Sequence, residues 1–258
     1  MKHLCAVLGV VLLSIPAFAA DKKLELRYLG QSFFVLTTTG GTKVAFDPHA
    51  IEQLGRPTAA ADLVIISHPH PDHNRLDSIE NRTKAKVIEG IKTLPPAAEG
   101  GPPRFTWNPV DETFRDVKIR NVGTYHDMVQ GLQRGRNSVF ILEVDGIKLV
   151  HLGDLGHLLS DDQIKQIGPM DVLLIPVGGV YTLNGARAKE VMAQLKPRRI
   201  VVPMHYGVGA WEDLLPVNEF LDGLSNVQRT PNSNLITIDP SAPVPKEPVV
   251  IVPGYGKR

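Results

Sequence analysis

Short apolar runs broken by Gly, Pro and Asp dominate the chain and predict a protein built mainly from β-strands. The runs are enriched in Val, Ile, Leu and Phe, residues typical of strands that are buried on at least one face. Asp145-Gly146 and Gly40-Gly41 lie between such runs and predict tight turns. We expect strands near Leu24–Leu29, Phe33–Thr38, Lys43–Asp47, Leu63–Ser67, Val87–Glu89, Val117–Val122, Val139–Val144, Lys148–Leu152, Val172–Pro176, Ile200–Pro203 and Leu235–Ile238.

Helical periodicity is clearest over Ala186–Leu195, where apolar residues recur at helical spacing before Pro197 ends the pattern. Further helices are expected near Asp161–Gln166 and Val217–Leu224. Strands interspersed with a few helices, without a linker that separates two cores, predict one layered α/β domain over residues 20–258.

Two segments show no regular pattern. Thr93–Pro103 is rich in Pro, Gly and Ala and predicts a surface loop. A proline-rich tail begins at about Asp239, and within it Val249–Val252 is expected either to add an edge strand or to remain extended.

The N-terminus has the pattern of a secretory signal peptide, residues 1–19. Lys2 precedes an apolar run over Leu4–Ile15, and Ala17-Phe18-Ala19 supplies small residues for cleavage. A buried first helix or a membrane anchor is the alternative. The run is shorter than the ~20 residues that span a bilayer, and Pro16 ends it. We therefore expect cleavage after Ala19 and an exported protein, periplasmic or secreted, with no membrane span afterwards.

The composition limits the possible types of metal ligand more strongly than it limits the possible partners. The single cysteine, Cys5, lies within the expected signal peptide, so any metal ligands of the mature chain must be histidine or carboxylate. The chain has 28 Lys and Arg residues and 27 Asp and Glu residues. Of these, only Lys2 lies in the first 19 residues, so the positive and negative side chains of the mature chain are equal in number. Without a basic stripe, a nucleic-acid partner is not favoured and a small-molecule substrate is expected. The pattern does not determine the oligomeric state.

A dense cluster of metal-ligand types, His68-Pro69-His70-Pro71-Asp72-His73, directly follows the apolar run Leu63–Ile66. Imidazole and carboxylate groups suit Zn²⁺, Mn²⁺ and Fe²⁺. Each proline favours an extended conformation for the residue before it, so His68 and His70 should project to the same side. Asp72 and His73 follow as the chain turns away, where they can serve a second metal ion.

Three more candidates share one property: each lies just past the end of an apolar strand. They are His126, Asp154 and His205. Strand ends gather at one edge in layered α/β folds, and functional sites are often built there. Taken together with the histidine cluster, these residues supply enough ligands for two metal ions.

With these residues in place, the chain resembles the metallo-β-lactamase superfamily from about Leu26 to Ile238. Its H-x-H-x-D-H signature is matched at His68, His70, Asp72 and His73, and an early aspartate stands at Asp47. The compact layout and the Pro203–Gly207 segment, Pro-Met-His-Tyr-Gly, are similar to the L-ascorbate-6-phosphate lactonase-like hydrolases of this superfamily.

The resemblance implies an αββα sandwich with a two-metal site at one edge of its two sheets. It places one ion on His68, His70 and His126 and the second on Asp72, His73 and His205. Asp154 would bridge both ions, and Asp47 would steady the signature loop. Two features depart from the family pattern: both x positions are proline, and His126 is not in a Gly-His-Ser/Thr sequence.

Such a site predicts a hydrolase that uses two divalent metal ions, in the first place Zn²⁺. Two ions that share a water lower its pKa from about 15.7 toward 7 and supply hydroxide at neutral pH. We expect cleavage of an ester, lactone, amide or phosphodiester bond, with Asp72 and Asp154 in the catalytic machinery. Two alternatives remain open: an iron-dependent oxidoreductase of the same fold and a non-catalytic periplasmic metal-binding protein.

Residues near these motifs are weaker candidates for substrate contacts. Residues 178–184 run from a strand into the predicted helix and either line the site or cap the helix through Thr182 or Asn184. His151, inside a strand, is expected to be structural. The other candidates for substrate or metal contact are Tyr206, His157, Thr182 and His49, with Arg134, Arg136 and Arg187 for an anionic substrate.

Overall fold

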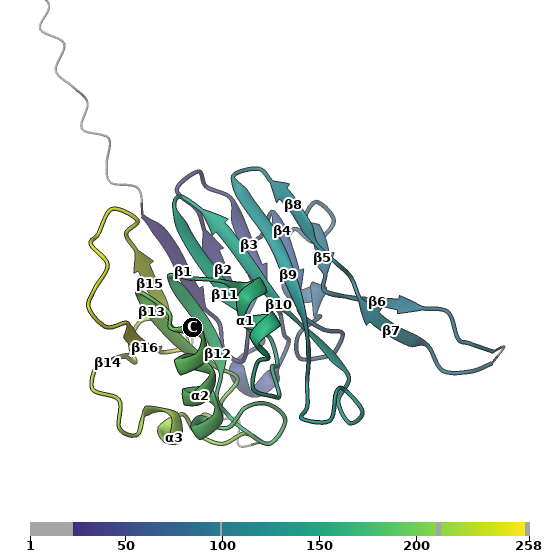
Figure 1. The fold of residues 1–258 in the computed structure, drawn as a ribbon. Coiled ribbons are helices and arrows are strands. Elements are labelled where there is room, and N and C mark those ends of the chain that lie inside the picture. Colours follow the sequence, from purple (N-terminus) through teal and green to yellow (C-terminus); the bar gives the residue numbers. More distant parts are fainter. Residues whose placement is uncertain (1–22, 99, 210–212, 256–258) are drawn as a thin grey trace, which may run out of the picture.

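Two β-sheets packed face to face form the body of the protein (Figure 1). The computed structural model describes residues 23–98, 100–209 and 213–255, so the expected signal peptide and Cys5 lie outside the described residues. The first sheet has six strands in the order β15 (Leu235–Ile238), β1 (Leu24–Tyr28), β2 (Phe34–Thr37), β3 (Lys43–Phe46), β4 (Leu63–Ile66) and β5 (Lys86–Glu89).

The second sheet has eight strands, some of which pair antiparallel and others parallel. Its order is β14 (Val227–Thr230), β16 (Val249–Pro253), β13 (Ile200–Met204), β12 (Val172–Pro176), β11 (Ile147–His151), β10 (Arg136–Val144), β9 (Val117–Tyr125) and β8 (Asp111–Phe114). β8 to β11 pair antiparallel, whereas β11, β12, β13, β16 and β14 pair parallel. The parallel strands end at one edge, which places the loops that follow them side by side.

The main core lies between the two sheets. Leu26, Phe46, Phe140 and Leu174 are among its fully buried side chains. β1 alternates buried and exposed residues, as a strand with one covered face does. β12 and β13 are buried throughout because the outer face of their sheet is covered as well. Burial of one large core side chain contributes roughly 1.5–3 kcal/mol.

All α-helices in the described ranges cover the outer face of the eight-stranded sheet. α1 (Asp161–Ile167) begins with a capping box of Ser160 and Gln163, and α2 (Gly185–Leu195) is capped by the Asn184 side chain. α3 (Asn218–Leu221) packs beside α2. The predicted helices are therefore confirmed, but the one near Val217–Leu224 is a single turn.

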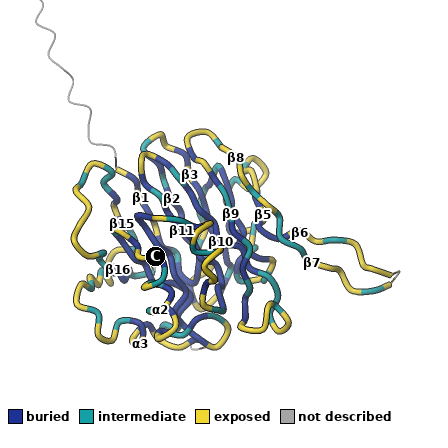
Figure 2. Tube along the Cα trace, in the orientation of Figure 1, coloured by how far each residue is buried: buried dark blue, intermediate teal, exposed yellow. Residues whose placement is uncertain are grey.

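The outer face of the six-stranded sheet has a thinner cover. Phe33, Val64 and Ile79 belong to a third apolar cluster there, beneath a segment that contains the short 3₁₀ helices η1 (Glu52–Leu54) and η2 (Leu76–Ser78). Figure 2 shows that the strands of the two sheets are largely buried, whereas the connecting loops and the β6–β7 hairpin are largely exposed. The structure confirms the predicted sandwich, with 3₁₀ turns in place of α-helices on this side.

The prediction that Thr93–Pro103 is a loop is wrong at its start. Thr93 and Leu94 belong to β6 (Ile91–Leu94), which pairs with β7 (Arg104–Trp107) in a hairpin that projects from the sandwich (Figure 1). The hairpin is mostly exposed, so its sequence lacks the alternation that marks a half-buried strand.

The prediction for Val249–Val252 in the proline-rich tail is also wrong. Val249–Val252 belongs to β16, which pairs with β13 on one side and β14 on the other. It is therefore an inner strand, neither an edge strand nor an unpaired extension. The described helices include none that is both long and apolar enough to cross a membrane.

Candidate metal centre

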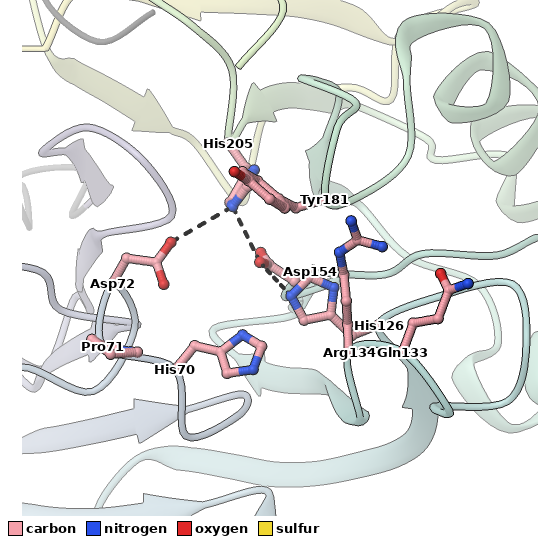
Figure 3. Close-up of a pocket in the computed structure, with 9 residues that line it drawn as sticks. All are labelled: His70, Pro71, Asp72, His126, Gln133, Arg134, Asp154, Tyr181 and His205. Carbon is pink, nitrogen blue, oxygen red and sulfur yellow. Dashed lines mark ion pairs between the residues drawn. The ribbon is translucent and has the colours of Figure 1, made fainter. Parts of the chain in front are cut away.

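The ends of five strands bring the candidate ligands together at one edge of the sandwich. The His68–His73 loop follows β4, and Asp47 follows β3, both in the six-stranded sheet. His126, Asp154 and His205 follow β9, β11 and β13 of the eight-stranded sheet. Figure 3 shows how side chains from the two sheets converge on one pocket.

The first group of ligand atoms consists of imidazoles alone. His68, His70 and His126 each offer a ring nitrogen, and these atoms all lie within 4.8 Å of one another. Nε2 of His68 is 3.1 Å from Nδ1 of His70. Three imidazoles at this spacing can hold one divalent ion.

The second group contains a carboxylate. Asp72, His73 and His205 also offer ligand atoms within 4.8 Å of one another. Oδ2 of Asp72 lies 3.4 Å from Nε2 of His73 and 3.8 Å from Nε2 of His205. This group can hold a second divalent ion beside the first.

Asp154 lies between the two groups and faces both of them. Its Oδ2 is 3.7 Å from Nε2 of His68 and 3.1 Å from Nε2 of His126. The same oxygen is 3.2 Å from Nε2 of His73 and 3.1 Å from Nε2 of His205. A single buried carboxylate oxygen is thus placed where it can bridge two ions.

Asp47 contacts both ligand groups, His73 directly and His68 through Ser67. Its Oδ1 accepts a hydrogen bond from the Ser67 backbone N–H at 2.7 Å, and its Oδ2 accepts from the Ser67 hydroxyl at 2.7 Å and from Nδ1 of His73 at 3.0 Å. The Ser67 oxygen in turn lies 2.9 Å from Nδ1 of His68. Because Nδ1 donates in each ring, Nε2 of His68 and of His73 is left as the ligand atom.

Further hydrogen bonds position three other candidate ligands, Asp154, His205 and Asp72. The Asp154 N–H donates to the Asn137 side-chain oxygen at 3.0 Å, and the His205 N–H donates to the Gln31 carbonyl at 2.8 Å. The Gln31 side chain also donates to Oδ2 of Asp72 at 2.9 Å. Gly153 has a φ of +54°, and a Cβ there would stand 2.4 Å from the Asn137 side chain, so only glycine fits before Asp154.

Burial and neighbouring charges move the pKa values of His68 and His70 in one direction and that of His73 in the other. Burial lowers the pKa of His68 and of His70 below the ordinary histidine value. Burial acts the same way on His73, but the carboxylates of Asp154, Asp72 and Asp47 outweigh it and hold its pKa well above that value. Burial would raise the pKa of Asp154, yet the neighbouring histidines keep it well below its usual range. The carboxylates thus favour a positive charge at His73, whereas burial disfavours one at His68 and His70.

The residues fit a pair of divalent ions. Nε2 of His73 and Oδ1 of Asp154 are buried without a hydrogen-bond partner, a costly state that a metal ion relieves. Imidazole and carboxylate donors suit Zn²⁺, Mn²⁺ and Fe²⁺. Asp47, His68 and His73 also lie close enough to form a ligand group, but both Asp47 oxygens already accept hydrogen bonds.

The ligands open into a cavity of about 450 Å³. Its wall includes Gln133 and Arg134 from the loop between β9 and β10 and Tyr181 from the loop after β12 (Figure 3). Asp127 shapes the first loop because its carboxylate accepts four backbone N–H bonds, including that of Arg134 at 2.7 Å. Because Tyr181 lines the cavity, the segment of residues 178–184 contributes to the site.

Several predicted contact residues lie away from this cavity. Tyr206 is buried and lines a separate cavity, and burial raises its pKa to about 12. The His157 ring accepts from the Tyr125 N–H at 3.1 Å and contacts the Leu158 carbonyl at 2.7 Å. Thr182 precedes the α2 cap and does not line the cavity, which is lined by its neighbour Tyr181.

Two further histidines pack behind the site. His151 stacks on Phe46 at 5.2 Å between ring centres, and its Nδ1 accepts from the Gly153 N–H at 3.0 Å. His49 is fully buried, accepts from the Ile51 N–H at 3.1 Å, and has a pKa lowered by burial to about 4. Both are satisfied structural residues.

Sequence reasoning missed Gln31 and Asn137, which contact candidate ligands, whereas Tyr181 lies in the 178–184 segment that it proposed for the wall of the site. Gln31 lies between β1 and β2, far along the chain from the motifs, and has a φ of +52°. A polar residue in the tight turn between two apolar runs was the only signal that could have identified it. Nothing in the sequence around Asn137 marks its role.

Comparison with known proteins identifies the family. Residues 25–205 match the beta-lactamase superfamily domain. A UPF0173 metal-dependent hydrolase of Thermococcus onnurineus is 32% identical over 197 residues, which cover 70% of this chain and 84% of the relative. A UPF0173 metal-dependent hydrolase of Thermus thermophilus is 32% identical over 207 residues, covering 70% of this chain and 83% of the relative.

Solved structures agree with this assignment. A structure from Thermotoga maritima, described as a Zn-dependent hydrolase of the metallo-β-lactamase superfamily, is 32% identical, with a TM-score of 0.65. The match covers 90% of this chain and 98% of that one. A metallo hydrolase of Ignicoccus hospitalis shares the fold at 22% identity and a TM-score of 0.55, covering 84% and 98%. The chain thus belongs to the metallo-β-lactamase superfamily and, within it, to the UPF0173 family of metal-dependent hydrolases.

Proposed function

We propose that this metal-dependent hydrolase is dinuclear and cleaves an ester, lactone, amide or phosphodiester bond of a small molecule. The observation that carries the proposal is the position of Asp154, whose Oδ2 lies 3.1–3.7 Å from one nitrogen of each of four histidines. Two of these histidines belong to each ligand group, so one carboxylate can serve two ions.

Two bound divalent ions would supply hydroxide at neutral pH and polarise the bond that it attacks. The chain's own residues define the surroundings of that reaction. Asp47 and Ser67 orient the rings of His68 and His73, and Gln31 orients Asp72. Arg134 can donate hydrogen bonds to an anionic oxygen of the substrate from the cavity wall. The Tyr181 hydroxyl can position the substrate from the mouth.

Two finer expectations from the sequence belong to this proposal. The segment from Pro203 to Gly207 resembles lactonase-like hydrolases, which makes lactones the first substrates to test. The N-terminal pattern supports export to the periplasm or the medium. Zn²⁺ is the first metal ion to test. Release of residues 1–19 on secretion, seen by intact-mass measurement, tests the export signal.

The decisive experiment combines elemental analysis of the purified mature protein with a hydrolysis screen. About two equivalents of zinc or manganese, together with activity that disappears on chelation and returns on metal addition, are expected. The screen uses chromogenic lactones, esters, phosphodiesters and amides. Asp162→Ala, an exposed carboxylate on α1, serves as a control that should keep metal and activity.

Three outcomes would contradict the proposal. Full activity in metal-free protein would exclude metal-dependent chemistry. Two equivalents of iron with oxygen consumption and no hydrolysis would favour the oxidoreductase alternative. Stable metal binding with neither reaction would favour a non-catalytic metal-binding protein.

A further inference from the structure

A second cavity lies beside the metal centre and shares part of its wall. It has a volume of about 340 Å³ and is lined by Pro69, His70, Ile91, Phe105, Gly131, Arg134, Gly135 and Arg136. His70 and Arg134 also line the cavity at the metal centre. The two spaces are therefore neighbours across a metal-ligand candidate, and we call the second one the side groove.

Part of the wall of the side groove is apolar, beside the polar residues His70, Arg134 and Arg136. Pro69 and Ile91 are apolar, and Phe105 is 40% exposed, so its ring offers an apolar surface to a bound chain. Neither Gly131 nor Gly135 has a side chain to narrow the space, and a Cβ added at Gly135 would meet nothing within 4 Å. None of the lining residues carries a carboxylate.

The groove is preformed because the base of the β6–β7 hairpin is fixed. Arg136 donates to the Phe105 carbonyl at 2.8 Å, and its guanidinium lies 4.8 Å above the Trp107 ring centre. The Trp107 indole N–H is shared between the carbonyls of Thr124 and Asn137, at 3.1 and 3.0 Å. A preformed apolar space loses little conformational entropy when a chain enters it.

Arg134 stands at the junction of the two cavities. Its guanidinium donates to the Val180 carbonyl at 3.1 Å and lies 5.4 Å from the Tyr181 ring centre (Figure 3). This geometry holds the positive charge between the metal centre and the groove, where an anionic or strongly polarised head group would meet it. The same loop exposes Met128, Val129 and Leu132 to solvent, which adds apolar surface near the site.

We infer that the side groove binds an alkyl or acyl chain attached to the group that is cleaved at the metal centre. The substrate class is then an amphiphile: an ester, amide, lactone or phosphodiester whose polar end meets Arg134 and the metal ions. This inference rests on the proposed function and specifies its substrate. Phe105, exposed on the β6–β7 hairpin, would contact this chain.

The test measures binding of alkylphosphonates to the zinc-loaded protein by calorimetry, so turnover is not required. Methyl-, butyl- and octylphosphonate share one head group and differ only in their chains. If the chain enters the groove, affinity should rise roughly two- to fourfold with each buried methylene, and at least tenfold from methyl to octyl. Equal affinities along the series would overturn the inference.

The Phe105→Ser variant tests whether the alkyl chain binds in the side groove. This variant should bind octylphosphonate about fivefold or more weakly and methylphosphonate as tightly as the unchanged protein does. Val244→Ser, which removes an exposed apolar side chain of the C-terminal tail, is the matched control and should change neither affinity. Loss of octyl binding in the control alone would place the chain elsewhere and contradict the groove.

The series separates this inference from the proposed function. Equal binding of all three phosphonates contradicts the groove but leaves a metal centre that recognises the head group. Failure of every phosphonate to bind the zinc-loaded protein contradicts both the groove and the hydrolase proposal.

Discussion

The two halves of the candidate centre differ in charge although they are built alike. The half formed by His68, His70 and His126 contains imidazoles only, whereas the half formed by Asp72, His73 and His205 contains a carboxylate. Asp47 contacts His73 directly, at 3.0 Å, but reaches His68 only through Ser67. The second half should therefore attract a cation more strongly, and the first half, open toward the side groove at His70, should be the side that meets substrate.

Removal of Asp154 should have the largest effect because both halves share it. We expect Asp154→Ala to lose the bridge and to lower kcat/KM by at least about 10³-fold, which corresponds to about 4 kcal/mol of transition-state stabilisation. Kinetics and elemental analysis of the same sample check this. A variant that retains two ions and near-normal activity would show that Asp154 is not the bridge.

Single ligand removals should separate the halves. His126→Ala and His205→Ala each leave one three-ligand group intact, so each should reduce the metal content from about two equivalents to about one. The ion that remains in His126→Ala should be the more tightly held, because its half keeps the carboxylates. Native mass spectrometry measures the stoichiometry, and loss of both ions from both variants would mean that the halves bind as one unit.

Asp47→Asn should act mainly on the carboxylate half, because Asp47 contacts His73 directly and His68 only through Ser67. The amide weakens the acceptor for Nδ1 of His73, so affinity for the ion in the carboxylate half should fall by roughly 10–100-fold. Chelator competition, which titrates the two ions separately, provides the measurement. Asp116→Asn is a matched control, because this aspartate also accepts hydroxyl hydrogen bonds, from Thr38 and Thr42, outside the site.

The smallest effect is a difference in titration in the metal-free protein. The raised pKa of His73 means that its proton stabilises the fold below the ordinary histidine pKa of about 6.5, and this contribution disappears as pH rises through the folded value. The lowered pKa values of His68 and His70 have the opposite sign, so their contribution is present above about 6.5 and is lost as pH falls. At neutral pH, imidazole NMR signals should show His73 protonated and the other two neutral. The same charge state in all three would remove the contrast between the halves.

The sequence was sufficient for the strands that bury apolar residues and for the order of candidate ligands along the chain. β3, β4, β11 and β13 are recognisable because the layered fold covers them, and the ligand candidates follow them directly. β7 and β14 are exposed or polar along most of their length, so no periodic pattern reveals them. β16 was hidden by the surrounding prolines.

Contacts made across the fold could not be predicted. Gln31 reaches Asp72 from a turn forty-one positions earlier in the sequence, and Arg134 enters the cavity because Asp127 folds its loop. Tyr206 is next to a ligand candidate in sequence but lines a different cavity, because the chain leaves β13 and turns at His205, whose φ is +50°. Adjacency in sequence identified candidate ligands that the structure brings together, but it did not identify the residues that surround them.

Each ligand group takes residues from both sheets, which gives metal binding a second role. His68 and His70 come from the six-stranded sheet and His126 from the eight-stranded sheet, and the other group is divided in the same way. An ion that joins the two layers binds the folded chain and not the unfolded one. At a free metal concentration one hundred times its Kd, such an ion adds about 2.7 kcal/mol to the free energy of unfolding. Metal supply thereby becomes a determinant of how long the protein survives heat and proteolysis, even in the absence of substrate.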